Sequence, residues 1–77
     1  MKRLLGRLVS FVPCFCYKKF SAVKEEIDPV MGVVDYINEK NGWFRVAYQA
    51  GETVQHECFK ETDIGEDVKL LGRKKNR

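Results

Sequence analysis

The chain has 77 residues, of which 44% are hydrophobic, 12% aromatic and 32% charged, and its formal net charge is +3. This length allows one small domain and leaves little room for a catalytic cleft walled by several elements. The apolar fraction is ordinary for a folded protein, which argues against a chain that is disordered throughout.

The charge is distributed unevenly along the chain. Residues 1–30 hold six basic and three acidic side chains, residues 31–72 hold four basic and eight acidic ones, and residues 73–77 hold four basic ones. The central part is therefore acidic, and both ends are basic. Because Lys and Arg neutralise phosphates, any affinity for nucleic acid would depend strongly on the two ends.

Three cysteines, Cys14, Cys16 and Cys58, make an odd number, which argues against the disulfide framework of a small secreted domain. We therefore expect a reduced, cytoplasmic protein. The pairs Cys14-x-Cys16 and His56-x-Cys58 together contain four groups that can bind zinc. The usual two-residue spacing is absent, however, and cysteines on an apolar face explain the same residues. We predict no metal and no cofactor, and the zinc site stays open as an alternative.

Residues 1–12 are predicted to form a basic amphipathic helix that ends at Pro13. The apolar side chains that share one helical face are Leu4, Leu5, Leu8, Phe11 and Val12. Such a helix either covers an open side of the domain or docks on a protein partner or a membrane surface. Its apolar run is too short to span a membrane.

The rest of the chain divides into a linker, a folded part and a tail. Residues 17–30 have the character of a linker, and Asp28-Pro29 disfavours continuation of a helix. We therefore predict an N-terminal helix and linker over residues 1–30, a small β-barrel over residues 31–72 and a basic tail over residues 73–77.

Residues 32–46 give the strongest local signal, a β-hairpin. β-branched and aromatic residues flank a polar turn that ends in Asn41-Gly42, and both residues of this pair tolerate a positive φ. The second strand continues to Ala50, and Gly51-Glu52 forms the next turn. Residues 53–59 alternate, with Val54, His56 and Cys58 on one face. A Gly-Glu-Asp turn at residues 65–67 then precedes a last short strand that ends before Gly72.

Four short strands separated by turns predict a mainly β chain. The architecture that we expect is a small OB-like or SH3-like antiparallel β-barrel with an N-terminal amphipathic helix.

The hairpin also carries a family resemblance. The pattern Gly32-x-Val34-x-Tyr36-Ile37-Asn38 resembles the first strand of cold-shock domains, Gly-x-Val-x-Trp-Phe-Asn, and residues 39–46 continue that match without a gap. Residues 64–70 are similar to the closing Gly-x-x-Val-x-Phe pattern of cold-shock and S1-type OB barrels. The resemblance covers residues 31–71 and implies a barrel that binds single-stranded RNA or DNA. Arg45 departs from the family, which has a second aromatic residue at this position, and residues 54–59 lack the paired aromatics of its third strand.

Binding of single-stranded nucleic acid needs aromatic faces for base stacking beside cationic groups for phosphate. We expect Tyr36, Trp43 and His56 to stack on bases and Lys40 and Arg45 to contact phosphates. The alternative for Trp43 is that it fills the small core.

No nucleophile and base share a recognisable motif, and no glycine-rich phosphate loop is present, so we predict that the protein is not an enzyme. The predicted function is that of a small non-catalytic nucleic-acid-binding accessory protein. The alternative is an interaction module that docks on a protein or membrane surface through residues 1–12.

Overall fold

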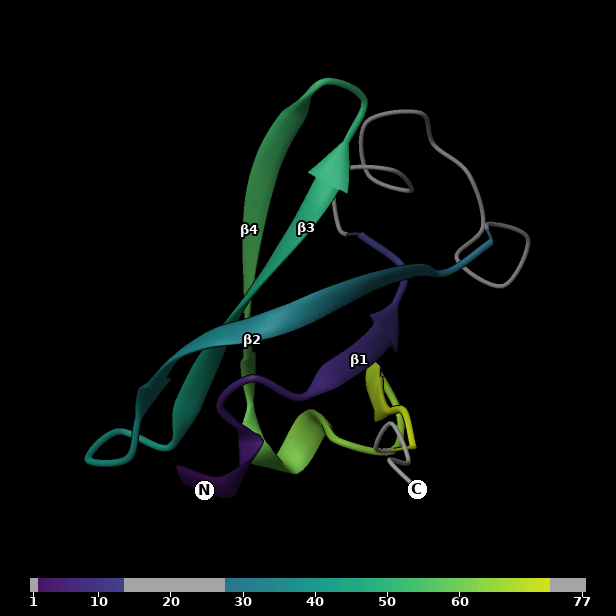
Figure 1. Ribbon diagram of the computed structural model, residues 1–77. Coiled ribbons are helices and arrows are strands. Elements are labelled where there is room, and N and C mark those ends of the chain that lie inside the picture. The colour runs from purple at the N-terminus through teal and green to yellow at the C-terminus, as the bar shows by residue number, and fades with distance from the viewer. Residues whose placement is uncertain (1, 14–27, 73–77) are drawn as a thin grey trace, which may run out of the picture.

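The structure, a computed structural model, describes residues 2–13 and 28–72, which form one antiparallel sheet (Figure 1). The strand order is β4-β3-β2-β1-β5. A 3-10 turn, η1 (Lys2–Leu4), precedes the sheet, and a second one, η3 (Glu61–Asp63), joins β4 to β5. The strands are β1 (Leu8–Phe11), β2 (Val30–Asn38), β3 (Trp43–Ala50), β4 (Thr53–Lys60) and β5 (Val68–Leu70). The prediction of a mainly β, antiparallel chain is confirmed.

The predicted amphipathic helix over residues 1–12 is wrong. After the single turn η1, Gly6 takes a φ of 84°, and the chain then continues as β1, which pairs with β2 on one side and β5 on the other. Val9 and Phe11 point into the core, so burial follows the period of a strand. A helix here would leave the backbone groups of two neighbouring strands unpaired, and burial of such groups is costly.

The apolar residues assigned to one helical face are divided between the core and the surface. Leu4 is buried, whereas the adjacent Leu5 is 59% exposed. Val9, which that face did not include, is fully buried. β1 lies before the predicted domain boundary at residue 30 and pairs with β2 beyond it, so the sheet joins residues from both sides of that boundary. Most of the predicted linker, Cys14, Cys16 and the basic residues 73–77 lie outside the described residues.

The predicted turns are confirmed. In the β2–β3 hairpin Asn38 is opposite Trp43, the carbonyl of Asn38 accepts a hydrogen bond from the Gly42 amide at 2.9 Å, and Gly42 has a φ of 75°. Gly51, with a φ of 67°, supports the turn between β3 and β4. Glycine adopts this left-handed conformation without the steric penalty of a Cβ, which explains its place in these turns.

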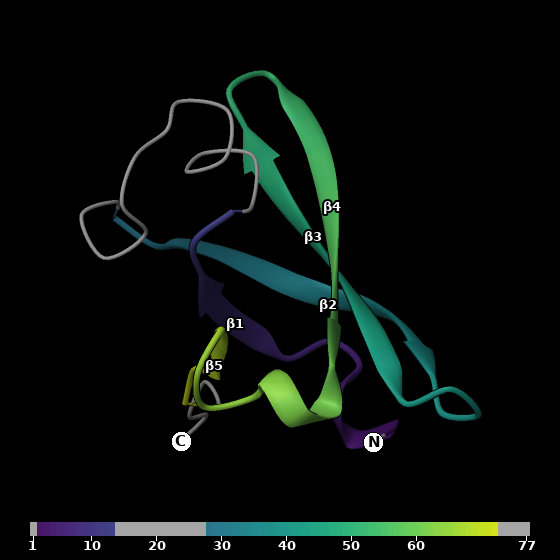
Figure 2. The same cartoon turned by 180° about the vertical axis from the view of Figure 1, so that it is seen from behind.

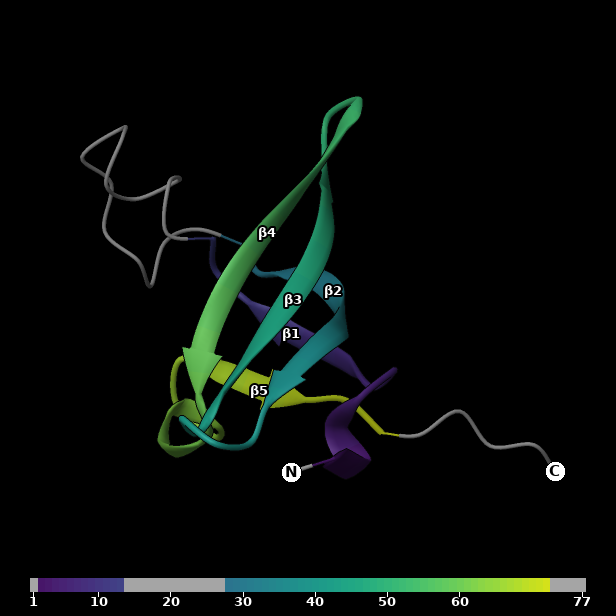
Figure 3. The ribbon, with the colours of Figure 1, turned by 90° about the vertical axis from the view of Figure 1, so that its left-hand side faces the viewer.

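The core is formed on the inner side of a strongly curled sheet. The ring of Phe11 in β1 packs edge-on against Tyr48 in β3 and Phe59 in β4, with ring centroids 5.1 and 5.3 Å apart. Because β1 and β4 are not neighbours in the sheet, the contact between Phe11 and Phe59 requires that the sheet bend back over itself. Figure 3 shows β1 and β5 crossing behind β3 and β4, and Figure 2 shows η3 leading from the end of β4 toward β5.

Gly32 in β2 lies close to β3 and to the Phe11 ring of β1. A Cβ added to Gly32 would lie 2.5 Å from Val46 Cγ1, 2.8 Å from the carbonyl oxygen of Ala47 and 3.2 Å from Phe11 Cε1. A glycine inside a strand commonly marks such an approach. The absence of a side chain at residue 32 therefore leaves room for Val46 and the Ala47 carbonyl of β3 and for the Phe11 ring of β1.

We predict that Gly32→Ala destabilises the protein by about 1–3 kcal/mol, the usual cost of overpacking a core. Urea denaturation followed by Trp43 fluorescence measures the effect. Gly72→Ala is the matched control because a Cβ there meets nothing within 4 Å, and we expect its unfolding free energy to be unchanged. Equal stability of the two variants would contradict the close packing at Gly32.

Candidate nucleic-acid interface

A β-bulge in β2 places two consecutive polar side chains on the outer face of the sheet. The register with β3 runs from Val34 opposite Val46 directly to Tyr36 opposite Arg45, so Asp35 is an extra residue. In a regular strand Asp35 and Tyr36 would point to opposite faces. The bulge removes this alternation, and both side chains are exposed beside Arg45.

Tyr36 and Trp43 form an aromatic pair outside the core. Their ring centroids are 5.5 Å apart with an interplanar angle of 42°, and Tyr36 is 44% exposed. Trp43 is half-buried and precedes the fully buried Phe44, which points to the inner side of β3. The guanidinium carbon of Arg45 lies 5.5 Å from the centroid of the Tyr36 ring, within the range of a cation–π contact. The three side chains therefore form one continuous surface.

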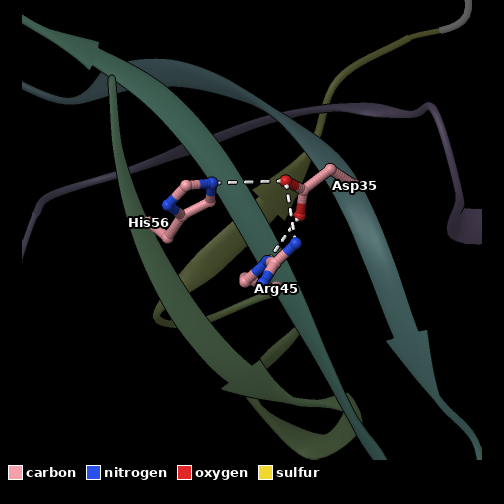
Figure 4. A network of polar contacts seen from close by, with 3 residues as sticks. All are labelled: Asp35, Arg45 and His56. Carbon is pink, nitrogen blue, oxygen red and sulfur yellow. Dashed lines mark hydrogen bonds and ion pairs between the residues drawn. The ribbon is translucent and has the colours of Figure 1, made fainter. Parts of the chain in front are cut away.

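Asp35 links this surface to β4 through a polar cluster (Figure 4). Arg45 Nε donates a hydrogen bond to Asp35 Oδ1 at 2.9 Å, and Arg45 Nη2 donates one to Oδ2 at 3.3 Å. Asp35 Oδ2 also lies 3.4 Å from His56 Nε2. The carboxylate thus accepts a two-pronged contact from the guanidinium, which is the geometry that Arg also uses to hold a phosphate.

The same contacts shift two ionisation equilibria. The hydrogen bond from Arg45 lowers the pKa of Asp35 below its ordinary value of 3.8, and the nearby positive charge of Arg45 adds to this effect. The hydrogen bond to Asp35 correspondingly raises the pKa of Arg45. Both shifts mean that the contact favours the ionised forms of the two side chains.

The structure brings most of the predicted site residues to one area. Tyr36 contacts both Trp43 and Arg45, and His56 approaches Arg45 through Asp35. Lys40 lies in the exposed turn between β2 and β3. Asp35 was missed as a site residue. The available signal was an aspartate within a run of strand-forming residues, where this residue type is unfavourable.

Each ring of the aromatic pair lines a separate surface hollow. The hollow beside Tyr36 has a volume of about 470 Å³, and the one beside Trp43 has a volume of about 410 Å³. The other residues around Tyr36 are Lys2, Leu5, Asp35, Ile37 and Glu39, and those around Trp43 are Asn41, Cys58, Phe59, Lys60 and Asp63. Both hollows combine an aromatic ring with a lysine, and carboxylates line them, two in the first and one in the second.

The described residues offer no separate metal centre. Within residues 2–13 and 28–72, no three His, Cys, Asp or Glu side chains are arranged to hold a metal ion. His56 and Cys58 are exposed on β4, and Cys58 is a free thiol. The other two cysteines of the alternative zinc site, Cys14 and Cys16, lie in the part of the chain that the structure does not describe. In the described part, no helix has the length and apolar character needed to cross a membrane.

No protein-family model, curated protein or solved structure matches the chain. The chemistry of the outer face is therefore the main basis for a functional proposal.

The lowered pKa of Asp35 predicts a pH-dependent contribution to stability. This contribution is fully present above the unfolded-state pKa, near 3.8, and is lost as the pH falls through the lower folded-state pKa. We expect the difference in urea midpoint between the wild type and Asp35→Asn to shrink on going from pH 7 to pH 3. The effect is small, because solvent screens an exposed ion pair. A difference that stays constant over this range would contradict the assignment.

Proposed function

We propose that the protein is a small, non-catalytic, cytoplasmic nucleic-acid-binding accessory protein that stacks single-stranded RNA or DNA on its outer face. The observation that carries this proposal is the Tyr36–Trp43 pair beside Arg45. The core is already supplied with aromatic rings, namely Phe11, Phe44, Tyr48 and Phe59. Two large rings left together outside a core in so small a domain favour a binding role, because every base offers a face for stacking.

We further infer that the sheet closes into a small barrel of the SH3-like type. Four consecutive strands pair in a meander, and β5 returns beside β1 after the 3-10 turn η3. The contact between Phe11 and Phe59 supports closure, since it joins strands that are distant in the sheet. The resemblance to cold-shock domains is strongest over residues 32–46, which form the β2–β3 hairpin. The proposed base stacking uses residues of this hairpin, so it does not require a closed barrel.

Electrostatics limit the affinity that we propose. Residues 2–13 and 28–72 hold seven basic and nine acidic side chains, so stacking rather than charge carries the contact with the described part. Lys60 lies opposite Trp43 on the neighbouring strand and supplies a cation beside the ring. The basic residues 73–77 add four charges, which predicts binding that weakens as salt rises.

Titration with single-stranded oligonucleotides tests the proposal. Trp43 is the only tryptophan, so we expect its fluorescence to be quenched at micromolar oligonucleotide and low salt. Tyr36→Ala removes one stacking surface and should weaken binding about tenfold, within the range for loss of one stacked base. Val54→Ala is the control: Val54 is exposed near the tip of the β3–β4 hairpin, and we expect its loss to leave the affinity unchanged.

Two results would contradict nucleic-acid binding by this face. One is an unchanged fluorescence and an unchanged anisotropy of labelled RNA and DNA at low salt. The other is equal affinity of Tyr36→Ala and the wild type, which would place binding elsewhere on the chain.

A second prediction concerns Asp35, which occupies the donors of Arg45 as a phosphate would. We expect Asp35→Asn to bind oligonucleotides more tightly than the wild type and to show a salt dependence steeper by about one charge, because Arg45 becomes available to the phosphate backbone. Glu52→Gln is the matched control, since it removes the same formal charge from the exposed turn between β3 and β4. Equal gains in affinity for both variants would show a general charge effect instead.

A protein-interaction role is the second candidate, and a specific surface favours it. Leu8 in β1 and Val33 in β2 are directly opposite each other, and both are 39% exposed; Met31 is exposed on the same face of β2. With Leu5, these residues replace the predicted helix as the apolar surface near the N-terminus. Capture of a partner that survives Tyr36→Ala but is lost in Leu8→Ser would favour this role over nucleic-acid binding.

A further inference from the structure

The hollow beside Trp43 combines a stacking surface with polar groups at its rim. It lies where the start of β3, the end of β4 and η3 meet. The carbonyl of Gly42 accepts a hydrogen bond from the Glu61 amide at 3.1 Å, which ties the β2–β3 turn to η3. Asn41 from the turn and Asp63 from η3 therefore line the same hollow as the indole ring. The backbone hydrogen bond between Glu61 and Gly42 joins the turn to η3, and the Asp63 side chain joins η3 to the end of β4.

Asp63 is positioned by a hydrogen bond that leaves it able to accept more. Its Oδ2 accepts a hydrogen bond from the backbone amide of Lys60 at 2.8 Å. An ionised carboxylate has about four lone-pair sites, so this single contact leaves most of its acceptor capacity unused. Asn41 is exposed, and its side-chain amide supplies both donors and an acceptor. The hollow thus presents a fixed acceptor, an adaptable amide and a neighbouring ammonium group.

We infer that this hollow holds an unpaired guanine base, with its ring stacked on Trp43 and its Watson–Crick edge directed at Asp63. This inference rests on the proposed nucleic-acid binding and specifies the base that the same site prefers. Lys60 lies opposite Trp43 and is placed to contact the phosphate of that nucleotide. The volume of about 410 Å³ leaves room for one nucleotide in an open site.

The donor pattern of the bases explains the choice of guanine. Guanine is the only common base whose Watson–Crick edge has two adjacent donors, N1–H and the N2 amino group, and a carboxylate can accept from both. Its O6 is an acceptor that the amide of Asn41 can satisfy. Adenine and cytosine each pair one donor with an adjacent ring acceptor, and uracil or thymine has carbonyl acceptors on both sides of N3–H. These acceptors would face the negative charge of Asp63.

The experiment compares oligothymidine of about eight nucleotides, a usual length for a small single-strand-binding fold, with the same strand carrying one central guanine. Anisotropy of an end-labelled strand is the readout, because it does not depend on how strongly each base quenches Trp43. We expect the full chain to bind the guanine strand about tenfold more tightly, within the range for one well-placed pair of hydrogen bonds to a base. Inosine in place of guanine removes the N2 amino group and should lose most of this gain.

Asp63→Asn is the corresponding protein variant. The asparagine oxygen can still accept from the Lys60 amide, so the cap of η3 is retained, while the acceptor aimed at the base is replaced by a donor. We expect its guanine preference to vanish, so that its affinities for the guanine strand and for oligothymidine become equal.

The possible failures are distinguishable. Equal wild-type affinity for the two strands, or a guanine preference that persists in Asp63→Asn or with inosine, overturns the guanine site and leaves the proposed function standing. No binding of either strand at low salt overturns the proposed function itself. The inosine result involves no change in the protein, so it remains decisive if Asp63→Asn folds poorly.

Discussion

The packing of Phe11 over Gly32 is the constraint on which the rest of this structure depends. Because residue 32 has no side chain, Val46 and the Ala47 carbonyl of β3 and the Phe11 ring of β1 can all lie close to its backbone. The Phe11 ring reaches Tyr48 and Phe59 across the inner side of the sheet. A sheet of this size has few residues that can exclude water. By curling around shared aromatic rings, it buries more apolar surface with those residues than a flat sheet would. The N-terminal residues complete the fold for this reason, and they pair as a strand between β2 and β5.

The candidate binding surface is a consequence of the same sheet. Because the inner sides of β1, β3 and β4 supply the core, the opposite face of β2 and β3 is left to solvent, and the bulge at Asp35 concentrates side chains there. The result is an aromatic pair with a guanidinium at its side, and that guanidinium is paired with a carboxylate. Two aromatic rings thus lie outside the core, while the guanidinium beside them is paired with Asp35.

This arrangement has a consequence for how the proposed binding would be controlled. The described part of the chain is acidic, so bases stacked on it would gain little from long-range attraction between protein and phosphate. The proposed contact would depend on the basic ends and on competition for Arg45. Selectivity would then come from short-range hydrogen bonds at the rim of the Trp43 hollow, since hydrogen bonds to base edges carry sequence information and phosphate contacts do not.

Local sequence determined the features that depend on neighbouring residues. The hairpin over residues 32–46, the turns at Gly42, Gly51 and Gly65 and the alternating strand that carries His56 were all predicted, because φ preference and side-chain alternation act over a few residues. The mainly β class and a shared location for Tyr36, Trp43 and Arg45 followed from those elements.

Tertiary structure decided what local pattern could not. The leucines near the N-terminus fit a helical period, yet residues 8–11 form a strand. As a strand they pair with the backbone groups of β2 and β5, which would otherwise lack partners. The glycine at residue 32 also leaves room for the Phe11 ring. The role of Asp35 depends on a bulge, and a bulge is a property of two paired strands rather than of one sequence segment. The hollow that joins Asn41, Trp43 and Asp63 likewise exists only because η3 is bonded to the turn before β3. Long-range pairing, which a single chain segment does not encode by itself, determined all three.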